Sequence, residues 1–333
     1  MTLLNIVYII IGIALVIWGA DRLTEGASSL ARGMHVPEIV IGLTIVAAGT
    51  SAPELFVSLV SALKGTSDLA VGNVIGSNIF NVMLIVGCSA VVAPIAISKS
   101  TVQKDIPFAV VASLLLFLLC FDDMNSAHLW GNNISRSDGF ILLAGFATFM
   151  VYTFVQARKN GEFPSDDDDD DYDDEEEEER KVDRKLLWRN LAWIAVGLTC
   201  LIVGSDLFVD AASYVAYRFG VRQSVVGLTI VAGGTSLPEL ATSVVAAKKG
   251  QSALAIGNAI GSNVFNILLI LGLTAVIHPL RIMGINIIDL SMMVLSIGLL
   301  WLFAYTKYTV SRREGILLIG GFVGYMAWLF YLL

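Results

Sequence analysis

The sequence predicts an all-α polytopic membrane protein with ten transmembrane helices, arranged as two inverted repeats of five helices each. Three observations lead to this fold class. Of the 333 residues, 56% are hydrophobic and only 15% are charged, whereas about 25% are charged in an ordinary soluble domain. Apolar runs of about 20 residues, long enough to cross a bilayer, recur along the chain. One long stretch of sequence also occurs twice.

Ten apolar segments are expected to cross the membrane. The first segment lacks the basic residues that begin a secretory signal, and its pattern returns in the sixth segment, so we expect a retained helix. Cys88, Cys120 and Cys200 lie in or at the ends of segments and are expected to be small packing residues. The ten segments are 3–24, 37–63, 69–93, 106–122, 137–157, 187–209, 223–247, 253–277, 285–306 and 314–333.

The repeat relates residues 42–87 to residues 227–272 without a gap, at an offset of 185, and about two-thirds of the positions are identical. The first copy contains "GLTIVAAGTSAPE" and "GSNIFN", and the second contains "GLTIVAGGTSLPE" and "GSNVFN". Each half holds five segments, an odd number, so the two halves must cross the membrane in opposite directions. Such inverted repeats are typical of secondary transporters, whose site lies near the membrane midplane between the repeats.

An acidic tract separates the halves. It reads "DDDDDDYDDEEEEE" at 166–179, and without its thirteen acids the net charge would change from −8 to about +5. It has no EF-hand pattern and is expected to be a solvated linker. Sixteen of the 21 Lys and Arg residues lie on one side of the membrane if the N-terminus is outside. We therefore expect both termini outside a cell (inner) membrane, a first repeat at 1–157, a cytoplasmic linker at 158–186 and a second repeat at 187–333.

The second segment contains a helix break followed by a carboxylate. Pro53 cannot donate a helical hydrogen bond, and we expect the break to free carbonyls near Ala47; Pro238 should do the same near Ala232. Irregular backbone at this depth is tolerated only where it is buried or lines a cavity. On a helix, Ala47, Thr50, Ser51 and Glu54 share one face. The break therefore predicts a binding site.

The predicted site has only oxygen ligands. Serine and Asn side chains of the next segment, and the equivalent residues of the second half, complete it. An all-oxygen set favours hard cations, and Ca²⁺ takes about 6–8 oxygens. Two carboxylates would neutralise one such ion, or the same oxygens could hold several Na⁺. The candidate ligands are Ala47, Thr50, Ser51, Glu54, Ser77, Asn81, Ala232, Thr235, Ser236, Glu239, Ser262 and Asn266.

Other polar and small residues have simpler interpretations. A lone intramembrane Glu could pair with a Lys or Arg, but no basic residue lies at comparable depth, so we favour a functional role. Gly72, Gly76, Gly257 and Gly261 are expected to serve helix packing. Asp21 and Asp206 lie close to segment ends and are expected at the membrane interface rather than in the ion path.

The doubled motif "GTSAPE"/"GSNIFN" and "GTSLPE"/"GSNVFN" resembles the alpha-repeats of the cation/calcium exchanger superfamily, and most closely those of prokaryotic sodium/calcium exchangers. The resemblance covers nearly all of the chain except the linker. It implies ten helices, of which the second, third, seventh and eighth form the ion core while the first and sixth slide across it. The family's ligand positions coincide with the twelve residues named above.

Asn266 departs from some relatives, which carry Asp there. In potassium-dependent members that Asp is tied to K⁺, so its absence argues against K⁺ cotransport. Amides at both Asn81 and Asn266 also resemble some calcium/proton exchangers. We therefore carry two hypotheses at the same carboxylates: Ca²⁺/Na⁺ antiport with about three Na⁺ per Ca²⁺, and Ca²⁺/H⁺ antiport.

Two further classes were compared with antiport. A Ca²⁺ channel could use rings of acids and carbonyls, but a site buried in broken helices favours alternating access. An intramembrane protease is the enzyme alternative, and no Gly-x-Gly-Asp or Ser/His arrangement supports it. We therefore expect a protein that is not an enzyme. We expect no cofactor, no nucleic-acid partner and no obligate protein partner; the partners are Ca²⁺, Na⁺ or H⁺, and lipid.

Overall fold

The protein is mostly helical. The computed structural model describes residues 2–34, 36–120, 132–159, 184–219, 232–282, 285 and 287–332. Within these residues seven helices are long and apolar enough to cross a membrane, or eight if one bent pair is a single span. The prediction of a polytopic helical protein is confirmed at this level.

The first half begins with a long helix and continues through a broken segment. Its elements are α1 (Thr2–Gly33), α2 (Glu38–Ile41), η1 (Gly42–Val46), α3 (Ala47–Thr50), α4 (Ala52–Leu63), α5 (Ser67–Ile79), η2 (Phe80–Val86), α6 (Gly87–Val92), η3 (Thr101–Asp105), α7 (Ile106–Leu119) and α8 (Arg136–Lys159).

The second half follows the same order. The N-terminal part of the predicted segment 223–247 lies outside the described residues, as does the acidic tract. The elements are α10 (Arg184–Arg218), α12 (Ala232–Thr235), α13 (Leu237–Lys248), α14 (Ser252–Val264), η5 (Phe265–Leu271), α15 (Gly272–Ile277), α16 (Ile287–Lys307) and α17 (Arg312–Leu332).

The predicted helix break is present in the second segment. Helix α3 ends at Thr50, α4 begins at Ala52, and the two parts meet at an angle of 46°. Ser51 between them has φ −84° and ψ 8°, outside the helical region. Pro53 lies in the first turn of α4, where a missing N–H costs no helical bond. Ser236 separates α12 from α13 in the same way, with φ −94° and ψ 9°.

Wide π-helical turns occur within the most buried segments. The π-helix η2 follows α5 without interruption, and η5 follows α14, at positions that differ by the repeat offset of 185. Such turns are rare and are found mostly at functional sites. The sequence analysis did not predict them, because side-chain periodicity barely distinguishes a single π turn from an α-helix.

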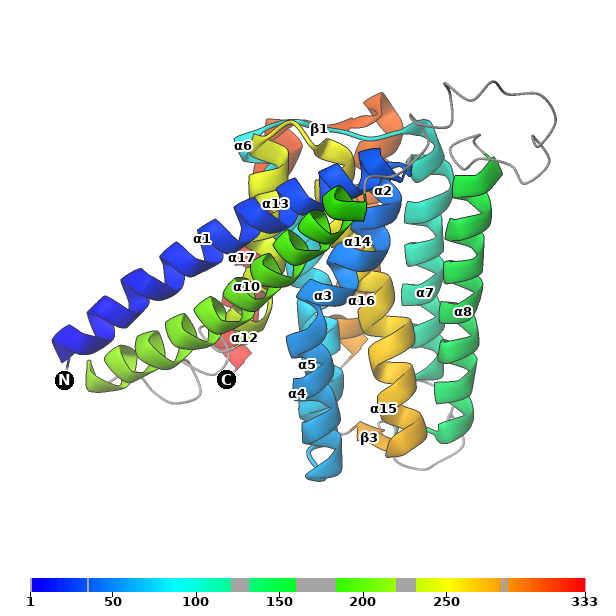
Figure 1. Ribbon diagram of the computed structural model, residues 1–333. Helices are drawn as coiled ribbons and strands as arrows, with labels where there is room; N and C mark the ends of the chain where they lie inside the picture. The colour runs from blue at the N-terminus through cyan, green and yellow to red at the C-terminus, as the bar shows by residue number, and fades with distance from the viewer. Residues whose placement is uncertain are drawn as a thin grey trace, which may run out of the picture.

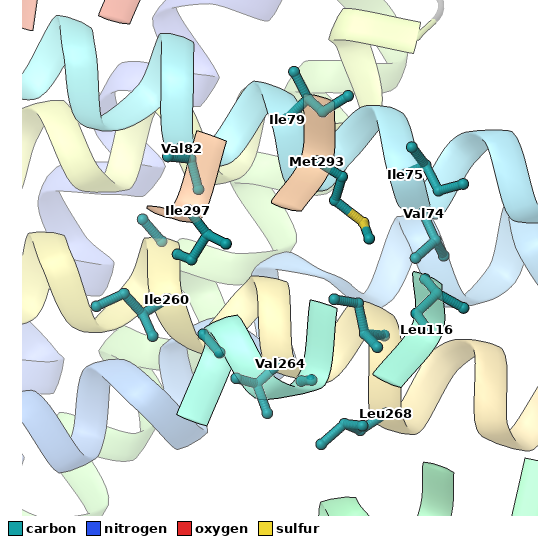
Figure 2. Packing of buried hydrophobic residues seen from close by; sticks show 14 of the residues in the cluster. Val74, Ile75, Ile79, Val82, Leu116, Ile260, Val264, Leu268, Met293 and Ile297 are labelled. Atoms are coloured by element: carbon teal, nitrogen blue, oxygen red, sulfur yellow. The ribbon is translucent and has the colours of Figure 1, made fainter. Parts of the chain in front are cut away.

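Helices α5 and α14 lie at the centre of the molecule. In an apolar stretch of 18 residues within each span, 72% and 78% of the residues are buried for Ser67–Val92 and Ser252–Ile277, against 22% and 28% for Leu4–Gly33 and Leu187–Ala216. Figure 2 shows Val74, Ile75 and Ile79 of α5 near Ile260 and Val264 of α14, with residues of α16 and α7 between and around them. This apolar core holds the central helices, which with η2 and η5 carry four of the twelve candidate ligands: Ser77, Asn81, Ser262 and Asn266.

Helices α1 and α10 form a separate layer. In Figure 1 they run side by side, strongly tilted, across one side of the other helices. A Cβ atom at Gly12 would lie 2.8 Å from the Gly204 carbonyl oxygen, and one at Gly19 would lie 2.8 Å from that of Gly197. The backbones of the two helices are therefore in direct contact, as small residues allow in membrane proteins.

Glycine packing is also found on α14, as predicted. A Cβ at Gly257 would lie 2.9 Å from the Ile39 carbonyl oxygen, and one at Gly261 would lie 2.8 Å from the Leu43 backbone. A Cβ added at Gly72 or Gly76 would have no described atom within 4 Å outside its own helix turn. The segment equivalent to α2 and η1 in the second half falls outside the described residues, so the prediction for these two stays open.

Two small antiparallel sheets join the halves, although the sequence predicted only helices. Strand β1 (Ile95–Ala96) pairs with β4 (Thr309–Val310), and β2 (Asn132–Ile134) pairs with β3 (Leu280–Ile282). In Figure 1, β1 and β3 lie at opposite ends of the helices. Each sheet therefore ties one half of the chain to the other.

Candidate cation-binding site

The two predicted glutamates lie at equivalent helix starts. Glu54 is in the first turn of α4 and Glu239 in the first turn of α13, each directly after a proline. A helix N-terminus carries partial positive charge, which favours a carboxylate there. Both side chains are nevertheless inside the protein, 0% and 1% exposed. Burial of two acids in a membrane protein is costly unless something compensates their charge.

The serines at the helix breaks bind the glutamates crosswise. Ser51 Oγ donates to Glu239 Oε1 at 3.0 Å, and Ser236 Oγ donates to Glu54 Oε1 at 3.0 Å. Each bond runs from one half of the chain to the other. The structure therefore brings these four predicted residues together at the contact between the halves.

The second oxygen of each carboxylate has no partner among the described residues. Glu54 Oε2 and Glu239 Oε2 are buried and accept no hydrogen bond from any of them. None of the ion pairs in the described part of the chain involves either glutamate. An unpaired buried charge is strongly unfavourable. The two oxygens therefore require a cation or a proton.

Further unpartnered oxygens come from the central helices. Ser77 Oγ of α5 lies 3.3 Å from Ser236 Oγ, whereas the buried Ser262 Oγ of α14 has no partner. Asn81 donates through Nδ2 to Asn263 Oδ1 at 3.0 Å, which leaves Asn81 Oδ1 unpartnered. Within the described part of the chain, neither Oδ1 nor Nδ2 of Asn266 has a partner. The two amides lie in η2 and η5, where the backbone is π-helical.

Thr50 and Thr235 border the carboxylates. The Thr50 hydroxyl lies 3.1 Å from both Val46 O and Asn258 Oδ1, and it interacts with Glu239. Thr235 interacts with Glu54 in the equivalent way. A hydroxyl has one proton, so Thr50 can donate to one acceptor at a time and still offers oxygen lone pairs.

The expected release of the Ala47 carbonyl is wrong. Ser51 N–H donates to Ala47 O at 3.0 Å, as in an uninterrupted helix. The reason is spacing: the N–H that Pro53 lacks would have bonded four residues back, at Gly49. The Ala47 oxygen keeps only its second lone pair for an ion. Ala232 is the first described residue of α12. The expected release of its carbonyl stays a prediction.

The sequence analysis missed a second set of polar residues around the glutamates. Asn73 Nδ2 donates to Glu54 O at 3.3 Å and to Ser58 Oγ at 3.1 Å. Asn258 Nδ2 donates to Glu239 O at 3.3 Å and to Ser243 Oγ at 2.9 Å. These amides fix the first turns of α4 and α13. The signal was available, because each of these residues recurs at the 185-residue offset.

The arrangement suits a hard cation. Its unpartnered atoms are carboxylate, amide and hydroxyl oxygens, together with one amide NH₂ group at Asn266. No cluster of three or more His, Cys, Asp or Glu side chains occurs among the described residues. Oxygen ligands favour ions such as Na⁺ and Ca²⁺ over zinc or copper.

Comparison with known proteins identifies one family and several relatives that transport ions or lie in membranes, in agreement with this cation site. The family described as "Sodium/calcium exchanger protein" matches residues 4–155 and 189–331. The sodium/calcium exchanger MaX1 of Methanosarcina acetivorans is 30% identical over 351 aligned residues, covering 100% of each chain. YrbG, an inner membrane protein of Escherichia coli, is 36% identical, covering 99% of this chain and 98% of YrbG.

A solved structure is also similar. The structure of the sodium-calcium exchanger NCX_Mj, soaked with zero Na⁺ and Ca²⁺, superposes with a TM-score of 0.82 and 29% identity. The match covers 99% of this chain and 100% of that chain. The similarity therefore extends over the whole fold and includes both halves of the candidate site.

Proposed function

The chain belongs to the sodium/calcium exchanger family of integral membrane antiporters, and we propose that it exchanges Ca²⁺ for Na⁺ at the Glu54–Glu239 site. One observation carries the proposal. Each glutamate is bound by a serine of the opposite half, and each has a second carboxylate oxygen that is buried and unpartnered. Two such carboxylates together match the charge of one Ca²⁺.

The proposed ligands are the twelve residues that the sequence indicated. The buried oxygens of Ser262, Asn81 and Asn266 have no hydrogen-bond partner in the described structure, and Ca²⁺ needs about 6–8 oxygens. The proposed set is Ala47, Thr50, Ser51, Glu54, Ser77, Asn81 and their counterparts Ala232, Thr235, Ser236, Glu239, Ser262 and Asn266.

Transport would proceed by alternating access between inverted repeats. We assign ten helices in two repeats of five, at 1–157 and 187–333, because every element of the site recurs at the 185-residue offset. The crosswise serine–glutamate bonds and the two shared sheets support this assignment. A buried site between such repeats is typical of carriers.

The proposed orientation follows from charge. Both termini would face outside, and the linker 158–186 would lie in the cytoplasm, because most Lys and Arg residues then lie inside. The relative YrbG is named as an inner membrane protein, which supports a bacterial-type inner membrane as the location. The proposal needs no cofactor, no protein partner and no chemical catalysis.

The proposed stoichiometry is about three Na⁺ for one Ca²⁺. The hydroxyl, amide and carbonyl oxygens around the two carboxylates leave room for about three Na⁺. One net charge then crosses per cycle, worth roughly 2.3 kcal/mol per 100 mV. Transport would therefore be electrogenic.

The test is ⁴⁵Ca²⁺ uptake into proteoliposomes loaded with Na⁺. Uptake should require the outward Na⁺ gradient, and it should accelerate when the interior is clamped positive, because three charges leave as two enter. It should slow when the interior is clamped negative. Uptake that responds to neither Na⁺ nor voltage would overturn the proposal.

Ca²⁺/H⁺ antiport is the second candidate. Amides rather than acids occupy both Asn81 and Asn266, and a proton could also satisfy the unpartnered carboxylate oxygens. In this case a pH gradient alone would drive uptake and Na⁺ would have no effect. The same vesicles, prepared without Na⁺ and with an acidic interior, distinguish the two ions.

A further inference from the structure

An ion-pair cluster fastens α1 to the end of α13. Lys249, directly after α13, lies with Nζ 2.6 Å from Asp21 Oδ1. The same ammonium donates to Asp21 O at 3.0 Å and to Thr24 Oγ1 at 3.2 Å. Both charged side chains are about one-third exposed. Asp21, expected only to face the membrane interface, thus holds two elements together.

Arg22 of α1 also belongs to this cluster. Its guanidinium lies 2.9 Å from Asp21 Oδ2 and 2.7 Å from Glu25 Oε2. It also lies over the rings of Trp18 and Trp193, at 5.8 and 5.2 Å from their centroids. Because Trp193 belongs to α10, the cluster joins both tilted helices to the end of α13.

The repeat supplies the same pair of charges at the opposite end of the molecule. At the offset of 185, Asp21 corresponds to Asp206 on α10, and Lys249 corresponds to Lys64 after α4. Asp206 and Lys64 are exposed, and neither forms an ion pair within the described structure. Asp206 is instead close enough to Asp210 to be repelled by it.

The helices that carry the two pairs are packed differently. Helix α1 packs along α13, whereas the equivalent helices α10 and α4 make no comparable contact. Figure 1 shows α13 beside α1, while α4 stands apart from the C-terminal end of α10. The equivalent pairs of helices are therefore in contact in one case, α1 with α13, and separated in the other, α10 from α4.

We propose that Asp21–Lys249 and Asp206–Lys64 are alternating gates of the exchange cycle. In inverted repeats, the two halves exchange conformations when the site opens to the other side. The closed pair would then open as α1 leaves α13, and Asp206 would meet Lys64 as α10 approaches α4. In the proposed orientation, the structure has its cytoplasmic gate closed and its extracellular gate open.

The two gates differ in strength. The counterparts of Trp18, Arg22 and Thr24 are Val203, Leu207 and Val209, none of which can bond to a lysine or an acid through its side chain. In the extracellular gate, Lys64 would meet Asp206 beside Asp210, the counterpart of Glu25, without counterparts of the arginine, threonine and tryptophan of the cytoplasmic gate. The cytoplasmic gate is therefore the stronger, and the resting protein favours the state in which it is closed.

Cross-linking tests the alternation without depending on the transported ion, although the inference rests on the proposed alternating-access mechanism. Cys88, Cys120 and Cys200 are first replaced by alanine. Cysteines are then placed at 21 and 249, at 64 and 206, or at all four positions. A bifunctional thiol reagent about as long as a lysine side chain bridges each pair, and mass spectrometry counts the remaining thiols.

Each pair should bridge in the liposome-embedded protein, the 21–249 pair faster, because α1 packs along α13 in this structure even apart from the two charges that the cysteines replace. In the four-cysteine protein, bridging one pair should exclude bridging of the other. Molecules bridged at both pairs, or a 64–206 pair that never bridges, would overturn the proposal. If the pairs alternate while neither Na⁺ nor H⁺ drives Ca²⁺ uptake, the proposed function fails and the gates stand.

Single substitutions provide the second measurement. In the 64–206 cysteine protein, Lys249→Gln should raise the bridging rate about two- to fivefold, the range expected for a partly exposed ion pair. Lys249→Arg should restore the original rate. The control is Lys248→Gln, which removes the same charge one residue earlier, where no ion pair exists among the described residues. If the 248 and 249 variants change the bridging rate equally, the effect comes from surface charge in general and the Asp21–Lys249 ion pair is not a gate.

Discussion

Replacing Glu54 or Glu239 by glutamine tests whether the two carboxylates bind Ca²⁺. Each change keeps the side-chain shape and removes one buried charge. At a ligand distance of about 2.4 Å and an effective dielectric constant of about 20, one carboxylate attracts Ca²⁺ by roughly 14 kcal/mol before dehydration of the ion is subtracted. If only about 4 kcal/mol of this survives dehydration, the loss of one charge weakens Ca²⁺ binding about a thousandfold.

Thermal unfolding of the purified protein measures this loss. Ca²⁺ at about 100 times its Kd stabilises a folded protein by about 2.7 kcal/mol. At the same Ca²⁺ concentration, a variant that binds a thousandfold more weakly gains only about 0.1 kcal/mol. The Ca²⁺-dependent rise in unfolding temperature should therefore disappear in both variants, together with ⁴⁵Ca²⁺ uptake. Without Ca²⁺, the variants should unfold at the same or a higher temperature, because one of two buried like charges is gone.

A matched control separates site charge from buried charge in general. Asp105 is a carboxylate outside the site that is only 8% exposed. Asp105→Asn should keep the Ca²⁺-dependent rise in unfolding temperature. A glutamine variant that keeps both a wild-type rise and wild-type uptake would refute the reasoning for that glutamate.

Three other substitutions test the linker, the helix contact and the polar support of the site. Replacing residues 166–179 by a Gly/Ser linker of equal length should preserve turnover at saturating Ca²⁺ in uptake assays, because the tract lies outside both repeats. Gly19→Ala should lower stability by about 1–3 kcal/mol in thermal unfolding, since its Cβ would lie 2.8 Å from a backbone oxygen of α10. Gly298→Ala should leave stability unchanged, because no described atom outside its own helix turn lies within 4 Å of the added Cβ. Asn258→Ala should cost about 1–3 kcal/mol, because Thr50 and Ser243 lose a buried partner; an unchanged unfolding temperature would contradict this role.

Sequence patterns predicted the helices well wherever hydrophobicity alone defines them. Long apolar runs and the Gly-Thr-Ser-x-Pro-Glu motif located the broken helix, and the structure places the break at Ser51. The ends of the tilted helices were less well predicted. The first segment was expected to end at residue 24, but α1 continues to Gly33, because Asp21 and Arg22 are paired and do not end the helix.

The candidate site could be proposed from the sequence, but the hydrogen bonds between its residues could not. The repeat and the acids indicated Glu54 and Glu239, and the structure places both in one buried cluster. No pattern could show that Ser51 would bind the glutamate of the other half, since a contact over 188 residues depends on the assembled fold. The π-helical turns and the short strands escaped for a related reason. Both are set by tertiary packing rather than by local side-chain preference.

The two sheets and the crosswise serine bonds have a consequence for how small such a protein can be. Each half supplies two strands, a serine hydroxyl and a carboxylate whose described partners lie in the other half. In the proposed inverted arrangement, a chain of half this length could build the same centre as a pair of identical copies inserted in opposite orientations. One chain that contains both halves would supply both orientations at once, with the acidic tract of residues 166–179 between the halves in the sequence.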